Sequence, residues 1–132
     1  MEIRVQAGQL GGVDADAIVV NPTHVSIALK YDSAKGAPRV VAKGADLLAM
    51  AIRDAADGAA VPVLQAPVLA RALYAHAELD REIPAALFGA VAQVLAYVYQ
   101  LRAAMAGRSP MPGELPALAV PAELDPHNET DA

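Results

Sequence analysis

Two apolar runs joined by a short polar corner constrain the fold of this chain more than any other stretch. The first run is Ala17 to Val20 and the second is Val25 to Tyr31, with Asn21-Pro22-Thr23-His24 between them. The first run is short and β-branched, as is typical of a strand covered on both faces. The second alternates large apolar residues with small or polar ones, which predicts a half-buried strand with Lys30 in solvent. The sequence therefore predicts two strands joined by a corner.

The peptide bond between Asn21 and Pro22 has a restricted chemistry. Proline has no backbone N–H, so the usual attack of the following amide nitrogen on an asparagine side chain is closed. The Asn21 side-chain amide nitrogen can instead attack its own main-chain carbonyl, form a succinimide and expel the Pro22 nitrogen. This reaction would cut the chain between residues 21 and 22 without a protease. The structural alternative is a plain turn, because both residue types favour turns.

The four corner residues are the candidate catalytic set. Asn21 supplies the nucleophile, and Pro22 is the leaving group that must accept a proton. His24 is the candidate to carry that proton directly or through water, because histidine is the side chain that titrates near neutrality. In the alternative interpretation His24 only hydrogen-bonds the turn. Thr23 is assigned to positioning rather than to catalysis.

A series of short motifs continues the pattern beyond the corner. In order, these motifs are Ala37-Pro38-Arg39-Val40-Val41-Ala42-Lys43-Gly44, Val61-Pro62-Val63, Leu69-Ala70-Arg71-Ala72-Leu73-Tyr74, Glu82-Ile83-Pro84 and Ala90-Val91-Ala92-Gln93-Val94-Leu95-Ala96. Together with the corner, they closely resemble the cytoplasmic domain of the FlhB/YscU family, the export-switch proteins of bacterial type III secretion. The resemblance covers roughly residues 14 to 102.

The resemblance implies a switch of substrate specificity in a flagellar or virulence export apparatus. The implied reaction is a single intramolecular self-cleavage between Asn21 and Pro22, not the turnover of a conventional enzyme. The implied partners are other export-apparatus proteins and export substrates or a ruler protein, at the cytoplasmic face of the inner membrane. The alternative function is a non-cleaving interaction module that substitutes for or competes with a longer export-gate protein.

The resembled proteins carry a helical membrane domain and a charged linker ahead of their first cytoplasmic strand. This sequence contains neither, and its initial Met1 favours a short stand-alone relative over a trimmed one. The uncharged stretch from Ile83 to Leu101 has nearly the length of a membrane span. Its glutamines and tyrosines favour a buried amphipathic helix instead. We therefore expect a cytoplasmic chain without a membrane span of its own.

Charged residues near the corner have two interpretations each. Arg39 and Lys43 flank the third predicted strand and are candidates for a partner-binding patch, although isolated basic residues are usually just solvated. Asp14 or Asp16 could orient His24, but solvated loop carboxylates are the commoner case.

Composition excludes several other functions. The net charge of −5 argues against a nucleic-acid-binding module. The absence of cysteine excludes disulfides and thiolate metal sites, and the three histidines are too scattered to suggest a metal site. We therefore predict no cofactor and no metal. Four further side chains are interpreted as packing against the core rather than lining a ligand site: Tyr74, His76, Tyr97 and Tyr99.

The predicted fold is a single α/β domain with a small mixed four-stranded sheet packed with helices. Residues 1–13 are expected to form a flexible arm, residues 14–106 the autocleaving export-switch domain, and residues 107–132 a proline-rich disordered tail. The third and fourth strands are predicted at 38–42 and 61–64. Helices are predicted to begin near Asp46, Pro67 and Pro84. The first should bury Leu47, Leu48, Ala51, Ile52 and Ala55, and the last should bury Leu87, Val91, Val94, Leu95, Val98 and Leu101.

Overall fold

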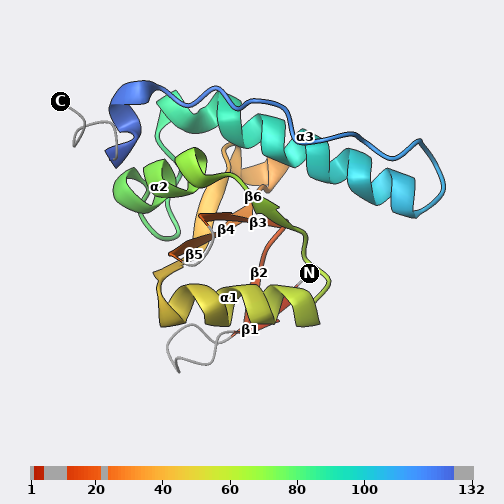
Figure 1. The fold of residues 1–132 in the computed structure, drawn as a ribbon, viewed down its shortest axis with the longest axis horizontal. Helices are drawn as coiled ribbons and strands as arrows, with labels where there is room; N and C mark the ends of the chain where they lie inside the picture. The colour runs from red at the N-terminus through yellow and green to blue at the C-terminus, as the bar shows by residue number, and fades with distance from the viewer. Residues whose placement is uncertain (1, 5–11, 22–23, 127–132) are drawn as a thin grey trace.

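The structure is a computed structural model that describes residues 2–4, 12–21 and 24–126. A four-stranded mixed sheet in the order β5-β4-β3-β6 separates helix α1 from helices α2 and α3 (Figure 1). The strands are β3 (Ala17–Asn21), β4 (Val25–Lys30), β5 (Arg39–Ala45) and β6 (Val63–Gln65); the helices are α1 (Leu47–Gly58), α2 (Pro67–His76) and α3 (Phe88–Met105). Two short strands, β1 (Glu2–Arg4) and β2 (Gly12–Asp14), form a separate antiparallel pair. The predicted fold class is therefore confirmed.

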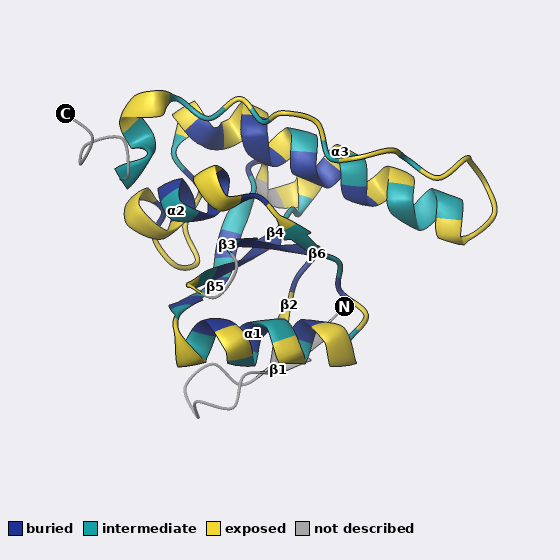
Figure 2. Cartoon of the chain, viewed as in Figure 1, coloured by how far each residue is buried: buried dark blue, intermediate teal, exposed yellow. Residues whose placement is uncertain are grey.

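Strand β3 lies inside the sheet between two neighbours. It pairs antiparallel with β4 and parallel with β6. Ala17 and Val19 belong to the core cluster on the side of α2 and α3, whereas Ile18 and Val20 belong to the cluster on the side of α1. Figure 2 shows most of this strand as buried, and only its last residue, Asn21, is half-buried. The prediction of a strand covered on both faces is confirmed.

Strand β4 is buried more completely than its alternating sequence predicted. Ser26 and Ala28, assigned to an open face, are both 0% exposed because α1 covers that face. The Ser26 hydroxyl donates a hydrogen bond of 2.9 Å to the carbonyl of Ala49 in α1, so the buried polar group is satisfied. Lys30 is bound to Asp14 at 2.8 Å instead of standing free in solvent. The half-buried interpretation was wrong because small and polar residues can also pack under a helix.

The helices differ from prediction mainly at their ends. Leu47 is 82% exposed, so the predicted buried face of α1 was wrong at its first position; the buried residues are Ala49, Ile52 and Ala56. Helix α2 begins at Pro67, as predicted. Helix α3 follows a 3₁₀ turn and buries most of its predicted apolar stripe. Within the described ranges, no helix is long and apolar enough to cross a membrane.

The chain after α3 turns back and runs along that helix toward α2 (Figure 1). We call residues 113–126 the C-terminal strap. Four of its apolar side chains pack against the larger core cluster: Leu115, Leu118, Val120 and Leu124. The packed part of the chain thus extends beyond the boundary predicted at residue 107. The last six residues of the predicted tail, and residues 1 and 5–11 of the predicted arm, lie outside the described residues.

Candidate functional site

The corner between β3 and β4 is closed by backbone hydrogen bonding. The Asn21 carbonyl accepts a hydrogen bond of 3.0 Å from the His24 N–H, as in a four-residue turn. Asn21 and Val25 are also register partners at the turn end of the hairpin. The predicted leaving group Pro22 and the predicted positioning residue Thr23 lie outside the described residues. The sheet therefore holds both ends of the corner next to each other.

The far side of the corner is tied to the start of α1. The His24 carbonyl accepts a hydrogen bond of 3.0 Å from the Asp46 N–H. Asp46 has a φ of 53° and a ψ of −118°, a positive-φ turn conformation that is dominated by Gly, Asn and Asp. Its side chain makes no capping bond to α1, although the sequence suggested Asp46 as a helix start. Asp46 thus anchors the beginning of β4 through its backbone.

A cavity of about 370 Å³ lies beside the corner. The hairpin contributes half-buried Asn21 and exposed His24, helix α2 contributes Arg71 and Tyr74, and Pro126 of the strap forms part of the wall. Val25 and Ala75 complete the lining. The structure therefore brings two of the four candidate catalytic residues to one accessible cavity.

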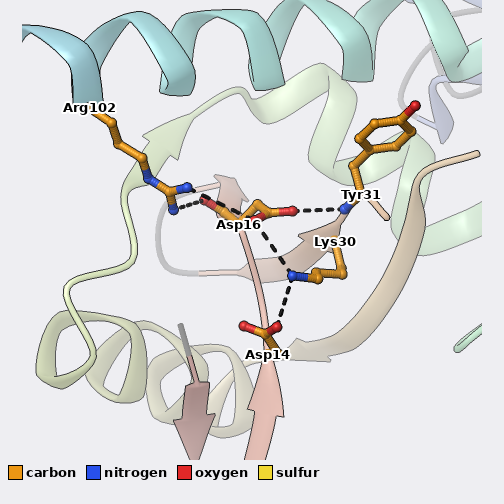
Figure 3. Close-up of polar contacts among 5 residues, drawn as sticks. All are labelled: Asp14, Asp16, Lys30, Tyr31 and Arg102. Carbon is orange, nitrogen blue, oxygen red and sulfur yellow. Dashed lines mark hydrogen bonds and ion pairs between the residues drawn. The ribbon is translucent and has the colours of Figure 1, made fainter. Parts of the chain in front are cut away.

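The two aspartates considered as partners of His24 lie at the opposite end of β3. The five residues of this strand separate them from the corner, at about 3.3 Å per residue. Asp16 accepts a hydrogen bond of 2.8 Å from the Tyr31 N–H, and Arg102 donates one of 3.1 Å to the Asp16 carbonyl (Figure 3). Asp16 thus ties the start of β3 to the end of β4 and to α3, and it does not orient His24.

Asp14 is the outer member of the same cluster. Lys30 donates a hydrogen bond of 2.8 Å to its carboxylate and lies 3.8 Å from the Asp16 carboxylate (Figure 3). This hydrogen bond lowers the pKa of Asp14 and raises the pKa of Lys30. The cluster fixes the start of β3 against the sheet, so its role is structural rather than catalytic.

The two basic residues assigned to a partner surface have different surroundings. The Lys43 ammonium donates hydrogen bonds to the carbonyls of Tyr74 and Ala77, at 3.2 and 2.9 Å, and lies 5.4 Å from the Tyr74 ring centroid. A cation at these carbonyls stabilises the end of α2. Arg39 begins β5 and is half-buried. Their assignment to a partner surface remains a prediction.

Side chains of α2 and α3 that sequence reasoning placed elsewhere contact the strap. Tyr97 and His76 hydrogen-bond strap carbonyls, whereas Tyr74 and Tyr99 are 39% and 48% exposed. The prediction that these four residues pack in the core was therefore wrong. No periodicity could have revealed the contacts, because their partners are backbone carbonyls of a segment whose regular structure is limited to one 3₁₀ turn at Ala122–Leu124. Among the described residues, no group of three or more His, Cys, Asp or Glu could hold a metal ion.

Known proteins share both the sequence and the fold around this corner. Residues 12–98 match the model of the FlhB HrpN YscU SpaS Family. The flagellar biosynthetic protein FlhB of Salmonella typhimurium is 55% identical over 119 residues, which cover 87% of this chain but only 30% of that protein. The cytoplasmic domain of FlhB from Shewanella putrefaciens superposes with a TM-score of 0.81 at 47% identity, covering 86% of this chain and 88% of that structure. A mutated EscU C-terminal domain gives a TM-score of 0.62 at 32% identity, over 64% and 85% of the two chains.

Proposed function

Because the chain belongs to the FlhB, HrpN, YscU and SpaS family, we propose that it is a substrate-specificity switch of a bacterial type III protein export apparatus. In this proposal it cleaves itself between Asn21 and Pro22 and acts at the cytoplasmic face of the inner membrane. Its partners are other export-apparatus proteins and export substrates or a ruler protein. The similarity to flagellar relatives favours a flagellar system. The observation that carries the proposal is the Asn-Pro bond at an accessible corner between the two central strands.

The proposed reaction needs no cofactor. The Asn21 side-chain nitrogen bonds to its own main-chain carbonyl carbon and loses a proton. The bond from that carbon to the Pro22 nitrogen breaks, and the nitrogen takes up a proton as the new amino terminus. The products are a succinimide at residue 21 and a second chain that begins at Pro22. One proton is lost and one is gained, so the reaction is balanced.

Positioning must supply much of the rate, because an amide nitrogen is a weak nucleophile. The described bonds at the corner support this requirement. The Asn21 carbonyl is held by the His24 N–H, and β4 is anchored by the Asp46 N–H. The exposed His24 side chain has access to water and can pass a proton to the leaving nitrogen directly or through a water molecule.

The sheet topology explains why the two products would remain one particle. Strand β3 ends the amino-terminal product, whereas its neighbours β4 and β6 both belong to the carboxy-terminal product. Residues 17–20 are buried on both faces, so separation would expose a central strand. The bonds from Tyr31 and Arg102 to Asp16 add a further attachment (Figure 3). Cleavage would therefore change the corner while the domain stays assembled.

A local change at the corner is sufficient for a switch if partners bind there. Cleavage releases residues 22–25 from their covalent link to β3, next to the cavity lined by Asn21 and His24. The new amino terminus and the end of β3 can then move independently. In this proposal the altered surface changes which substrates the apparatus admits.

The proposal is tested with Asn21→Ala in cells that lack the native protein. Alanine removes the nucleophile, so the variant should stay uncleaved and export only early cargo, whereas the parent should cleave and export late cargo. Immunoblots for fragments and assays of secreted cargo measure both outcomes. A folded, uncleaved variant that exports late cargo normally would contradict the switch function. A parent that never cleaves yet switches cargo would favour a non-cleaving interaction module.

A further inference from the structure

The C-terminal strap is held by side chains that bind its backbone. The Tyr97 hydroxyl donates a hydrogen bond of 2.7 Å to the Gly113 carbonyl. The Gln93 side chain contacts two backbone groups, donating to the Ala117 carbonyl at 3.3 Å and accepting from the Ala119 N–H at 2.9 Å. Such contacts do not depend on the side chains of the bound segment. They could hold another extended peptide in the same way.

The far end of the strap is held by a charge-assisted pair. Arg71 donates from Nε and Nη2 to the two carboxylate oxygens of Asp125, at 3.0 and 3.1 Å. Both side chains are less than one-fifth exposed, at 17% and 14%. A bidentate arginine–carboxylate contact is directional and selects for an acid at this position. The neighbouring His76 ring contacts the Leu124 carbonyl at 3.0 Å.

The apolar side chains of the strap do not fill the surface that they pack against. Leu115, Leu118, Val120 and Leu124 remain partly exposed while packing against the core. A cavity of about 290 Å³ remains between the strap and the start of α2, lined in part by Pro67. This surface therefore has room for larger apolar side chains than those of the strap.

We propose that the surface formed by Arg71, His76, Gln93 and Tyr97 is a peptide-binding site that the strap occupies in cis. Its other occupant is an extended segment of a partner protein, with apolar residues followed by a carboxylate that replaces Asp125. This binding does not require cleavage at Asn21. Because Pro126 lies in the wall of the corner cavity, exchange of the occupant would also alter the surface beside Asn21 and His24.

The test measures binding of a fluorescent peptide with the sequence of residues 113–126 to the full chain by anisotropy. A tethered segment competes at an effective concentration in the millimolar range, so the parent should bind the peptide weakly. Asp125→Ala loosens the strap but leaves Arg71 intact, and it should tighten peptide binding about tenfold. Glu123→Ala is the matched control, because it removes an exposed acid from the same segment and should bind as the parent does.

Two further measurements make the result decisive. Adding Arg71→Gln to Asp125→Ala should reverse the gain, because the acid of the peptide loses its partner. Hydrogen exchange of the parent with excess unlabelled peptide should increase in residues 113–126 while α2 and α3 stay protected. The proposal is overturned if Asp125→Ala binds no more tightly than Glu123→Ala. It is likewise overturned if the exchange of the strap is unchanged at the highest peptide concentration, a measurement that applies even if Asp125→Ala unfolds.

Discussion

The corner and the two strands that it joins differ in almost every physical respect. Residues 17–20 and 26–29 are buried, whereas Asn21 is half-buried and His24 is exposed. The strands are held by neighbours on both sides, whereas His24 lies outside the strands and is held through its backbone by Asn21 and Asp46. The contrast implies that stability resides in the strands and that the proposed chemistry resides in the corner. Substitutions should therefore affect one property without the other.

The largest expected effect is the loss of cleavage in Asn21→Ala. Alanine removes the only side-chain nitrogen that can form the succinimide, but it removes few packed atoms from a half-buried position. The free energy of unfolding should fall by only about 1 kcal/mol. Intact mass over time and thermal melting check the two parts of the prediction. Loss of the fold would instead identify Asn21 as a structural turn residue.

The next effect is a slower reaction in His24→Ala. Proton transfer by a positioned side chain typically contributes about 10²–10⁴-fold, so cleavage should slow by this order without being abolished. The measurement is the half-time of cleavage after rapid refolding from denaturant. Thr23→Ala serves as a comparison, and we expect a smaller change because its predicted role is positioning. An unaltered half-time in His24→Ala would remove the histidine from the mechanism.

A substitution in the strands should lower stability rather than act on the cleavage chemistry. Ile18 is 0% exposed and packs on the α1 side, so Ile18→Ala should lower the free energy of unfolding by about 2–5 kcal/mol. Urea denaturation measures this change. Met50→Ala in α1 is the control, because its side chain is 55% exposed and should change stability by less than about 0.5 kcal/mol. Equal effects of the two substitutions would contradict the assigned burial.

The smallest effect concerns Asp14, whose pKa is lowered by the hydrogen bond from Lys30. A group with a lowered folded-state pKa stabilises the fold above its unfolded pKa, and this stabilisation is lost as pH falls through the folded value. Near neutrality the free energy of unfolding of the parent should therefore exceed that of Asp14→Asn. The difference should be only about 0.5 kcal/mol, because solvent screens this partly exposed pair. The difference should begin to shrink near the ordinary aspartate pKa of about 3.9 and vanish only below the lowered folded-state pKa. Urea denaturation at several pH values tests this, and a constant difference would exclude the ion pair as its cause.

The same contrast explains what could be predicted from the sequence. Hydrophobic periodicity located the strands and helices because burial against a neighbouring layer requires it. It failed for Ser26, whose burial depends on a hydrogen bond to Ala49 from a distant helix. It also failed for the strap, because partly buried residues in a largely irregular segment need no regular spacing. The separation of Asp16 from His24, by contrast, follows from the length of the predicted strand between them, at about 3.3 Å per residue.

The proposed function requires a cut chain that stays assembled, and one measurement on the parent tests this directly. Purified protein is incubated at neutral pH and its mass is recorded under native and then denaturing conditions. In native buffer we predict a single particle that retains all 132 residues. On denaturation this particle should separate into residues 1–21 and 22–132. A single full-length mass, recorded under denaturing conditions after prolonged incubation at neutral pH, would contradict self-cleavage. Loss of residues 1–21 in native buffer would contradict the inference that β3 is held between β4 and β6.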